Sequence, residues 1–367
     1  MKKGLGLILM LAAVAVGFGY LYFGPEDSPH GSPGSFLGTR PVETVHIRYG
    51  SEKKGLLDDP ELQSFLRKEF HLQVDGAKMG SLEMSAGNLN GLDALWPSSD
   101  LAALLFAVRH PSVSFKKHNI FSTPMVFYSW PAVVEALEGA GVVQRRENAY
   151  RVLDLKALLD LMAAKRSWKS LGLPYQAGQV SFRCTDPAKS NSGFLVAGLL
   201  AIVMNDGAMV DEVALSRHMP RVAEIFKSMG YMEESSGILF DKYVKQGQGV
   251  FPLVANYESL MVEFYQANPG SREQIRNTIL VLVPEPTVWS EHPLIALTAK
   301  GARLMEALQH PTVQKLAWER FGFRSGAAAI GAEAAVYKEL GLAGRIQSAT
   351  VLPSMEIMER ILGALHS

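Results

Sequence analysis

From residue 44 onward, short apolar runs of the sequence alternate with longer amphipathic ones. The run TVHIRYG (44–50) has the apolar spacing of a strand, and DDPELQSFLRKEF (58–70) places its apolar residues at helical spacing behind an acidic start. Strand–helix–strand alternation predicts parallel strands joined by right-handed helical crossovers. The sequence therefore predicts an α/β fold, and 367 residues are enough for two lobes.

The same alternation predicts further elements along the chain. More strands are expected over 71–81, 91–99, 119–130, 178–187, 249–256, 278–286 and 292–298. More helices are expected over 100–110, 131–142, 152–165, 219–231, 238–247 and 300–323, and also from Asn191 and from Tyr257.

The N-terminal segment predicts a membrane helix. Lys2 and Lys3 precede about twenty uncharged residues, which is enough to span a bilayer with the N-terminus in the cytoplasm. A cleaved signal peptide is the alternative, but the apolar core is long for one and ends in aromatic residues. We favour an uncleaved signal anchor over 1–24, followed by a flexible tether rich in Gly, Pro and Ser over 25–42. Both interpretations place the folded part outside the cytoplasm.

The composition and motifs exclude several classes of protein. Lys and Arg together number 36, as do Asp and Glu, so the net charge gives no reason to expect nucleic acid as a partner. The single cysteine, Cys184, excludes an internal disulfide. The sequence has no zinc-ligand spacing, phosphate-binding loop or Gly-x-Ser-x-Gly motif. We therefore expect no enzyme, no cofactor and no metal, and keep an extracytoplasmic hydrolase only as a third hypothesis.

Small polar clusters recur where predicted helices begin. One interpretation is helix capping, and the other is a seat for an anion or a polar ligand on the free N–H groups. Ligands of open α/β sheets bind outside the carboxyl ends of the strands, so five such junctions favour a ligand seat. Asp186 has an alternative role in a turn around Pro187. The clusters are Gly50–Lys53, Gly80–Ser81, Pro97–Ser99, Thr185–Gly193 and Asn256–Ser259.

The segments RYGSEKKGLLDDPELQSFL, DALWPSSD, IFSTPMVFYSW, CTDPAKSNSGF and ANYESL together carry a resemblance over roughly residues 43 to 330. The chain resembles bacterial extracellular solute-binding proteins of the type II periplasmic-binding-protein fold, and most of all the molybdate-, sulfate- and phosphate-type branch. The resemblance implies two α/β lobes joined by two crossing strands, here within 122–130 and 284–298, with the ligand in the cleft between them. Lobe one would comprise 43–122 and 290–367, and lobe two 123–289.

The resemblance implies a binding protein for a small polar or anionic solute, and the N-terminal segment would tether it on the periplasmic side of a bacterial inner membrane. It would serve an ABC transporter or a sensing partner; the alternative is an interaction domain of an envelope or stress complex that keeps the fold without a ligand. Lys53 and Lys189 would attract an anion from the rim. The expected ligand-binding residues are Ser51, Glu52, Ser81, Ser98, Thr123, Thr185, Asp186, Ser190, Asn191, Ser192, Gly193, Asn256 and Tyr257.

Overall fold

The computed structural model describes residues 41–146, 150–324 and 335–366. The chain divides into two units, 1–41 and 42–367, and the fold below is that of the second unit. The predicted signal anchor and nearly all of the predicted tether lie outside the described residues. Within the described part of the chain, we find no helix that has both the length and the apolar character needed to cross a membrane.

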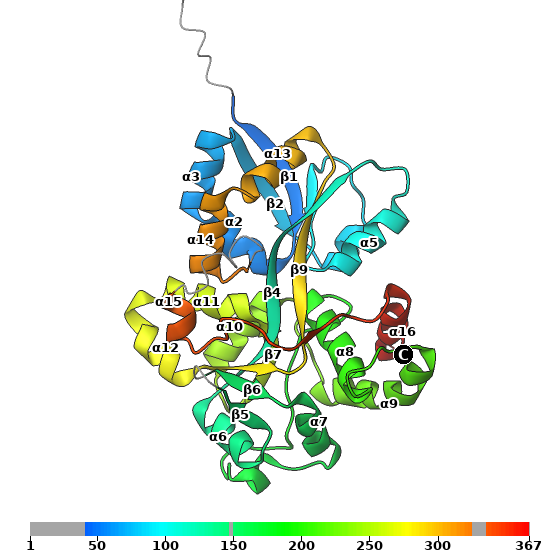
Figure 1. The fold of residues 1–367 in the computed structure, drawn as a ribbon, viewed down its shortest axis with the longest axis vertical. Coiled ribbons are helices and arrows are strands. Elements are labelled where there is room, and N and C mark those ends of the chain that lie inside the picture. The colour runs from blue at the N-terminus through cyan, green and yellow to red at the C-terminus, as the bar shows by residue number, and fades with distance from the viewer. Residues whose placement is uncertain (1–40, 147–149, 325–334, 367) are drawn as a thin grey trace, which may run out of the picture. The chain divides into compact units, whose positions relative to one another are not determined.

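Two long antiparallel strands, β4 (Lys116–Ser129) and β9 (Thr287–Ala296), run side by side through the middle of the unit (Figure 1). The first part of β4 pairs with β9, and its last residues pair with β7 (Leu253–Tyr257) and β8 (Leu280–Pro284). One strand therefore belongs to both halves of the sheet, whose order is β2-β1-β3-β9-β4-β8-β6-β5.

We call the part built around β1 the first lobe. Strand β1 pairs in parallel with β2 and β3, as the sequence predicted, and its alternate residues Val45 and Ile47 are fully buried. The elements of this lobe are β1 (Glu43–Tyr49), η1 (Ser51–Lys53), α2 (Lys54–Asp58), α3 (Pro60–Glu69), β2 (Leu72–Lys78), α4 (Ser81–Ala86), β3 (Ala94–Trp96), α5 (Asp100–Arg109), α13 (Ala299–Leu308) and α14 (Pro311–Phe321).

The second lobe has its own hydrophobic core around helix α8 (Asn191–Met204), which is apolar on all sides and buried along almost its whole length. The other elements of this lobe are α6 (Pro131–Gly139), β5 (Val143–Arg145), β6 (Arg151–Leu153), α7 (Leu155–Ala163), η3 (Trp168–Leu171), α9 (Glu212–Met229), α10 (Ser236–Gln246), α11 (Glu258–Ala267), η4 (Pro269–Ser271) and α12 (Arg272–Thr278).

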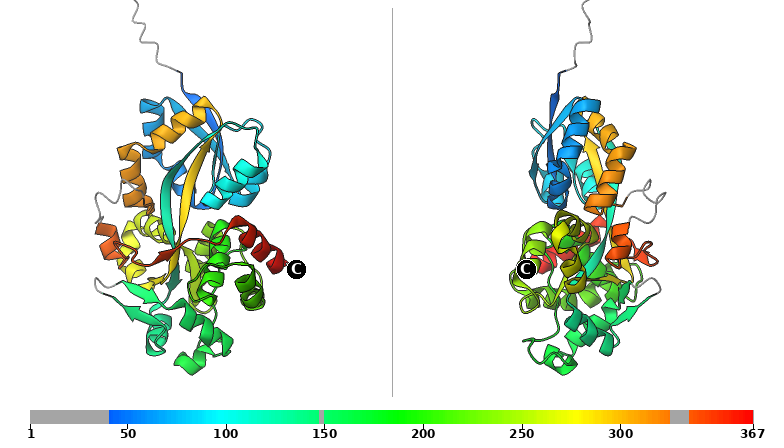
Figure 2. Two further views of the ribbon diagram at one scale, coloured as in Figure 1. Left: turned by 45° about the vertical axis from the view of Figure 1, so that its right-hand side comes forward. Right: turned by 90° about the vertical axis from the view of Figure 1, so that its left-hand side faces the viewer.

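The C-terminal segment returns to the second lobe, which corrects the expectation that all of 290–367 belongs to the first. After α15 (Ala335–Glu339), the short strand β10 (Ala349–Thr350) pairs with the start of β9, and α16 (Met355–His366) packs on α8 and α9 (Figure 2). The physical reason is the apolar stripe of α16, whose residues Met358 and Ile361 are fully buried in the core of the second lobe.

Three expectations about individual elements were wrong. Residues 178–187 form only isolated bridges, Ser167 with Gln179 and Arg183 with Val254, rather than a strand. The expected helix over 300–323 is two helices, because Pro311 disfavours helical backbone at the residue before it. The sheet is also mixed rather than parallel, since the crossing strands β4 and β9 pair antiparallel with each other and with β3, β7 and β8.

Candidate functional site

A cavity of about 630 Å³ lies between the two lobes and takes its walls from both. This volume is within the range of small-molecule sites in proteins. Its wall in the first lobe consists of Gly50, Ser51, Glu52, Lys78, Met79, Gly80, Ser81, Glu83 and Ser98. Its wall in the second lobe consists of Ala188, Lys189, Ser190, Asn191, Glu234, Ser235, Ser236 and Ile238.

The wall of the first lobe is built where β1, β2 and β3 end. Parallel strands in one sheet bring their carboxyl ends to the same edge, so the polar residues that follow each strand meet there. The backbone N–H of Ser98 donates to Ser81 Oγ at 2.9 Å and fixes two of these junctions to each other. A side chain on Gly80 would place its Cβ 2.6 Å from the carbonyl oxygen of Lys189, so glycine permits the lobes to approach this closely.

The wall of the second lobe is formed by the starts of α8 and α10. Their N-cap residues, Ser190 and Ser235, make no side-chain capping bond. By contrast, α7 and α9 in the same lobe are capped by Asp154 and Asp211. The first N–H groups of α8 and α10 are therefore left for water or a ligand, and a helix start favours negative charge.

Asn191 joins the two lobes at the edge of the cavity. Its Nδ2 donates to the Ser98 carbonyl oxygen at 2.6 Å and to the Tyr257 hydroxyl at 3.0 Å. Because a carbonyl oxygen only accepts, this contact fixes which end of the amide faces the first lobe. Asn191 Oδ1 is buried without a partner among the described residues.

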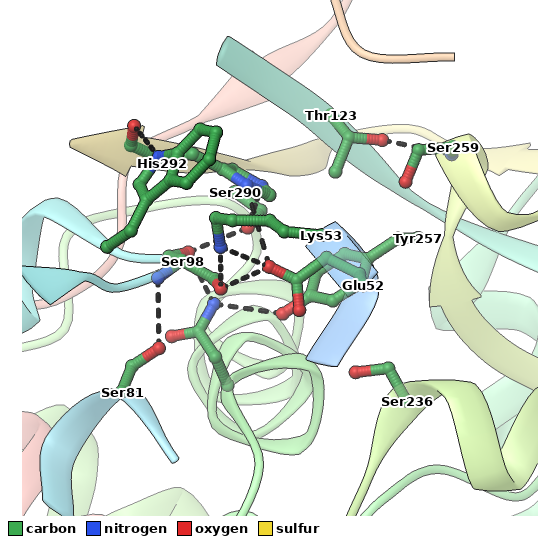
Figure 3. Close-up of polar contacts among 12 residues, drawn as sticks. Glu52, Lys53, Ser81, Ser98, Thr123, Ser236, Tyr257, Ser259, Ser290 and His292 are labelled. Atoms are coloured by element: carbon green, nitrogen blue, oxygen red, sulfur yellow. Dashed lines mark hydrogen bonds and ion pairs between the residues drawn. The ribbon is translucent and has the colours of Figure 1, made fainter. Parts of the chain in front are cut away.

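A buried ion pair forms the floor of the cavity (Figure 3). Lys53 Nζ lies 2.5 Å from Glu52 Oε1 and 2.8 Å from Ser98 Oγ, and the Ser98 hydroxyl also donates to Glu52 Oε1. Burial opposes ionisation of Glu52, but the charge of Lys53 and the hydrogen bonds from Lys53 and Ser98 lower its pKa to about 2. Glu52 is therefore ionised.

Lys53 is not at the rim, which corrects the expectation from the sequence. Its side chain is fully buried and lies over the ring of Trp96, with Nζ 5.6 Å from the ring centroid. The sequence alone gave no sign of this, because a lysine beside a glutamate is normally solvated. Of the two predicted rim lysines, only Lys189 is exposed, and it forms an ion pair with Glu234.

Behind this floor, Ser290 and His292 on β9 extend the polar network (Figure 3). Ser290 Oγ donates to the Ser98 carbonyl at 2.7 Å and lies 3.0 Å from His292 Nε2. Burial, with the nearby charge of Lys53, holds the pKa of His292 well below its ordinary value, so the ring is neutral. His292 is not among the ligand-binding residues that the sequence predicted.

The structure divides the expected ligand-binding residues into two groups. Those in the cavity wall are Ser51, Glu52, Ser81, Ser98, Ser190 and Asn191. Those outside the wall are Thr123, Thr185, Asp186, Ser192, Gly193, Asn256 and Tyr257, all of which belong to the described residues.

Near the start of α8, the residues outside the wall hold the local backbone in place. Thr185 Oγ1 and Ser192 Oγ are 2.7 Å apart, and both residues are fully buried. Asp186 accepts a bond from the Ala188 N–H at 2.9 Å, which is the turn role that the sequence left open. A Cβ on Gly193 would overlap the Thr185 carbonyl oxygen. Glycine is thus required there for backbone packing, and Gly193 does not line the cavity.

The remaining three residues outside the wall also bind other parts of the protein. Thr123 Oγ1 accepts from the Ser259 N–H at 3.2 Å, and Asn256 Nδ2 donates to the Ser236 carbonyl at 2.9 Å. The start of α10 thus lies against the end of β7, and Ser235 and Ser236 reach the cavity instead. The sequence missed these serines because no strand precedes them, although Ser-Ser-Gly before a helical pattern resembles the other junctions.

A second cavity of about 400 Å³ adjoins the first and contains Glu263 of α11. A Cβ on Gly55 of α2 would overlap the Glu263 carboxylate, so the two lobes meet closely at this point. Burial raises the pKa of Glu263 to about 7, repulsion from Glu52 and Asp241 adds to this, and Lys54 opposes it.

Replacement of Glu263 by glutamine is expected to remove a pH-dependent loss of stability. Since the folded-state pKa lies above the ordinary value of 4.5, the folded form holds its proton more tightly, and its stability falls as the pH rises from about 4.5 to 7. At about pH 8, Glu263→Gln should raise the free energy of unfolding by about 3 kcal/mol, with little effect near pH 4.5. Urea unfolding at both pH values measures this; Glu224→Gln, at an exposed site, is the control, and equal effects of the two variants would contradict the prediction.

Comparisons with known proteins identify solved structures that have a similar fold. No family model matches the chain, and no curated protein matches it either. Among solved structures, the sulfate-binding protein SubI of Mycobacterium tuberculosis H37Rv is 15% identical, with 86% of this chain and 96% of that chain covered at a TM-score of 0.54. Apo ferric ion-binding protein A of Pasteurella haemolytica is 14% identical, with 88% and 96% covered and a TM-score of 0.56.

A third structure, the substrate-binding protein of an ABC transporter from Agrobacterium tumefaciens, is 12% identical, covers 89% of this chain and 96% of that one, and has a TM-score of 0.54. These likenesses show that the chain has the type II periplasmic solute-binding fold that its sequence resembles. Among the described residues, no group of three or more His, Cys, Asp or Glu side chains is arranged to hold a metal ion.

Proposed function

We propose that this chain is an extracytoplasmic solute-binding protein that holds a small polar or anionic solute in the cavity between its lobes. Its N-terminal segment would tether it to the bacterial inner membrane, and it would deliver the solute to an ABC transporter or report it to a sensing partner. The observation that carries the proposal is the cavity wall, in which both lobes place serine hydroxyls around one space, next to two helix starts without side-chain caps.

The chemistry of this wall suits reversible binding of a polar solute. Neutral hydroxyl and N–H donors at helix starts can hold an anionic or polar group without a new buried counter-charge, whose desolvation would be costly. The close contacts between the lobes at Gly80 and Asn191 would exclude water around a bound solute. Relative movement of the lobes about β4 and β9 would admit and release it.

The hydrogen bonds of Ser98 favour binding over hydrolysis. Ser98 is the cavity serine next to both a lysine and a carboxylate, which is the arrangement that could suggest a nucleophile. Burial lowers the pKa of Lys53, but the charge of Glu52 and its hydrogen bond oppose this, and the ion pair holds the ammonium group as a donor to Ser98 Oγ rather than a base that could remove its proton. The Ser98 hydroxyl is thus a fixed part of the cavity floor.

A thermal-shift screen of the full-length chain tests the proposal. The panel contains oxyanions, sugars, hydroxy acids, amino acids and metal salts. A solute that binds only the folded state at about 100 times its Kd stabilises that state by about 2.7 kcal/mol, which corresponds to a shift of a few degrees. We expect at least one polar or anionic member to give such a shift. A flat response across the panel would contradict solute binding and favour the interaction domain without a ligand.

A further inference from the structure

The charged side chains of the cavity wall nearly cancel one another. The carboxylates of Glu52, Glu83 and Glu234 face the ammonium groups of Lys78 and Lys189, and Lys189 is already paired with Glu234. Among the described residues that form the wall, none is an arginine or a histidine. The wall thus offers no surplus positive charge to a fully ionised inorganic anion.

Glu52 has one carboxylate oxygen without a donor. Its Oε1 receives the bonds from Lys53 and Ser98, whereas Oε2 accepts no hydrogen bond from the described residues. Only 4% of Glu52 is exposed, and the residue lies in the cavity wall. Oε2 is not among the fully buried atoms without a partner, so solvent in the cavity reaches it. A bound molecule that displaces this water has to supply a donor in its place, because an unpaired polar atom away from water is costly.

A neutral donor suits Glu52 Oε2 better than a cationic one does. Lys53 Nζ is 2.5 Å from Glu52 Oε1 and fully buried, so the negative charge of Glu52 is already balanced. An ammonium group on Oε2 would share one carboxylate with Lys53, and two positive charges so placed in a poorly solvated site repel strongly. A hydroxyl or amide N–H supplies the hydrogen bond without this repulsion.

The opposite wall selects the other end of the ligand. The starts of α8 and α10, both without side-chain caps, favour negatively charged oxygens, and Ser190 lies beside them in the wall. A volume of about 630 Å³ also suits an organic molecule rather than a single tetrahedral ion.

We infer that the cavity takes a small organic anion with hydroxyl or amide donors, which places a donor on Glu52 Oε2 and its anionic oxygens at the starts of α8 and α10. Bare inorganic oxyanions such as sulfate and molybdate lack the donor and meet the ionised Glu52 instead. This inference rests on the proposed function, since it specifies the solute class of the same cavity.

Isothermal titration of the full-length chain at about pH 8 tests the inference with matched pairs of probes. Each pair shares an anionic group and differs in its hydroxyl groups: glycerol 3-phosphate with propyl phosphate, lactate with propionate, and gluconate with hexanoate. Sulfate and molybdate complete the set. We expect at least one hydroxylated member to bind at least tenfold more tightly than its partner and than either inorganic ion.

The remaining outcomes overturn the inference in distinguishable ways. Equal affinity within every pair, or tighter binding of sulfate or molybdate, would overturn the solute class while solute binding stands. If no hydroxylated probe binds but another solute shifts the melting temperature in the thermal screen, the proposed solute class is wrong and solute binding stands. If no hydroxylated probe binds and the thermal screen is also flat, the proposed function is wrong.

The variant Glu52→Gln tests which residue produces the preference. An amide cannot offer two acceptor oxygens, so the ratio of affinities within the binding pair should fall toward one. Glu224→Gln, an equivalent change at an exposed site on α9, should leave the ratio unchanged. An unchanged ratio in folded Glu52→Gln would overturn the role of Glu52, and if that variant does not fold, the paired probes with the unmodified chain still decide the solute class.

Discussion

The variant Arg324→Met is expected to lower the free energy of unfolding by about 3–5 kcal/mol, because it leaves a buried carboxylate without its partner. Arg324 Nε and Nη2 donate to Glu258 Oε1 and Oε2 at 2.8 and 3.0 Å, and Glu258 is fully buried. Arg324 follows the last helix of the first lobe, and Glu258 begins α11 in the second lobe. This bidentate pair therefore joins the lobes beside the crossing strands.

The surroundings of Arg324 explain why no other side chain can replace it. The guanidinium group also donates to the carbonyl oxygens of Ala343 and Gly344 and lies 5.0 Å from the ring centroid of Tyr337. A planar group with five donors satisfies all of these contacts, and the ammonium group of lysine does not.

Guanidinium chloride unfolding measures the effect of Arg324→Met. The matched control is Arg221→Met, which breaks an exposed pair with Glu224 and should cost less than about 1 kcal/mol. The double variant Arg324→Met/Glu258→Gln should recover part of the loss, since the carboxylate is then no longer charged. Equal costs for Arg324→Met and Arg221→Met would contradict the assignment of Arg324 as a buried structural partner.

The second large effect is expected at the cavity floor, where Lys53→Met should cost about 3–5 kcal/mol at neutral pH. The substitution leaves Glu52 buried with no adjacent positive charge, and burial then raises its pKa instead of allowing a pKa of about 2. The control is Lys156→Met, because Lys156 is exposed and forms its ion pair with Asp206 at the surface.

The effect of Lys53→Met on the free energy of unfolding should depend on pH. In the native chain, the low pKa of Glu52 contributes stability that is present above about pH 4.5 and is lost as the pH falls toward 2. In Lys53→Met the folded form must protonate Glu52, so its deficit should shrink as the pH is lowered from about 8 to 5. Urea unfolding across this range checks both chains. A deficit that stays constant with pH, or one no larger than that of Lys156→Met, would contradict the prediction.

The sequence predicted the first-lobe wall of the cavity because that wall follows a local rule. Ser51, Ser81 and Ser98 each come directly after a parallel strand, and the sheet brings such positions together. The same rule also predicted that Asn256 and Tyr257 line the cavity. They do not, because the start of α10 lies against the end of β7. No local pattern reports that packing, since it depends on a helix that reaches the cavity without a preceding strand.

Two other features depend on burial that the sequence does not encode locally. Glu52 and Lys53 are adjacent charges after a glycine, a pattern typical of a solvated turn, yet both point into the protein beneath Ser98. The apolar stripe of α16 indicates that this helix packs on something, but its position on α8 follows from the tertiary fold. Gly198 of α8 shows the fit, because a Cβ there would lie 3.0 Å from Sδ of Met358 in α16.

The most direct test of whether a solute binds between the lobes is calorimetric titration of two variants, each of which lacks one cavity serine from one lobe. With the probe that gives the largest thermal shift, Ser51→Ala and Ser190→Ala should each weaken binding by about five- to tenfold, the loss expected for one hydrogen bond to a charged or polar ligand. Ser228→Ala, a serine on α9 away from this cavity that donates to the Ile225 carbonyl, should change the affinity less than twofold. Unchanged affinity in both cavity variants, with folding intact, would contradict a binding site between the lobes.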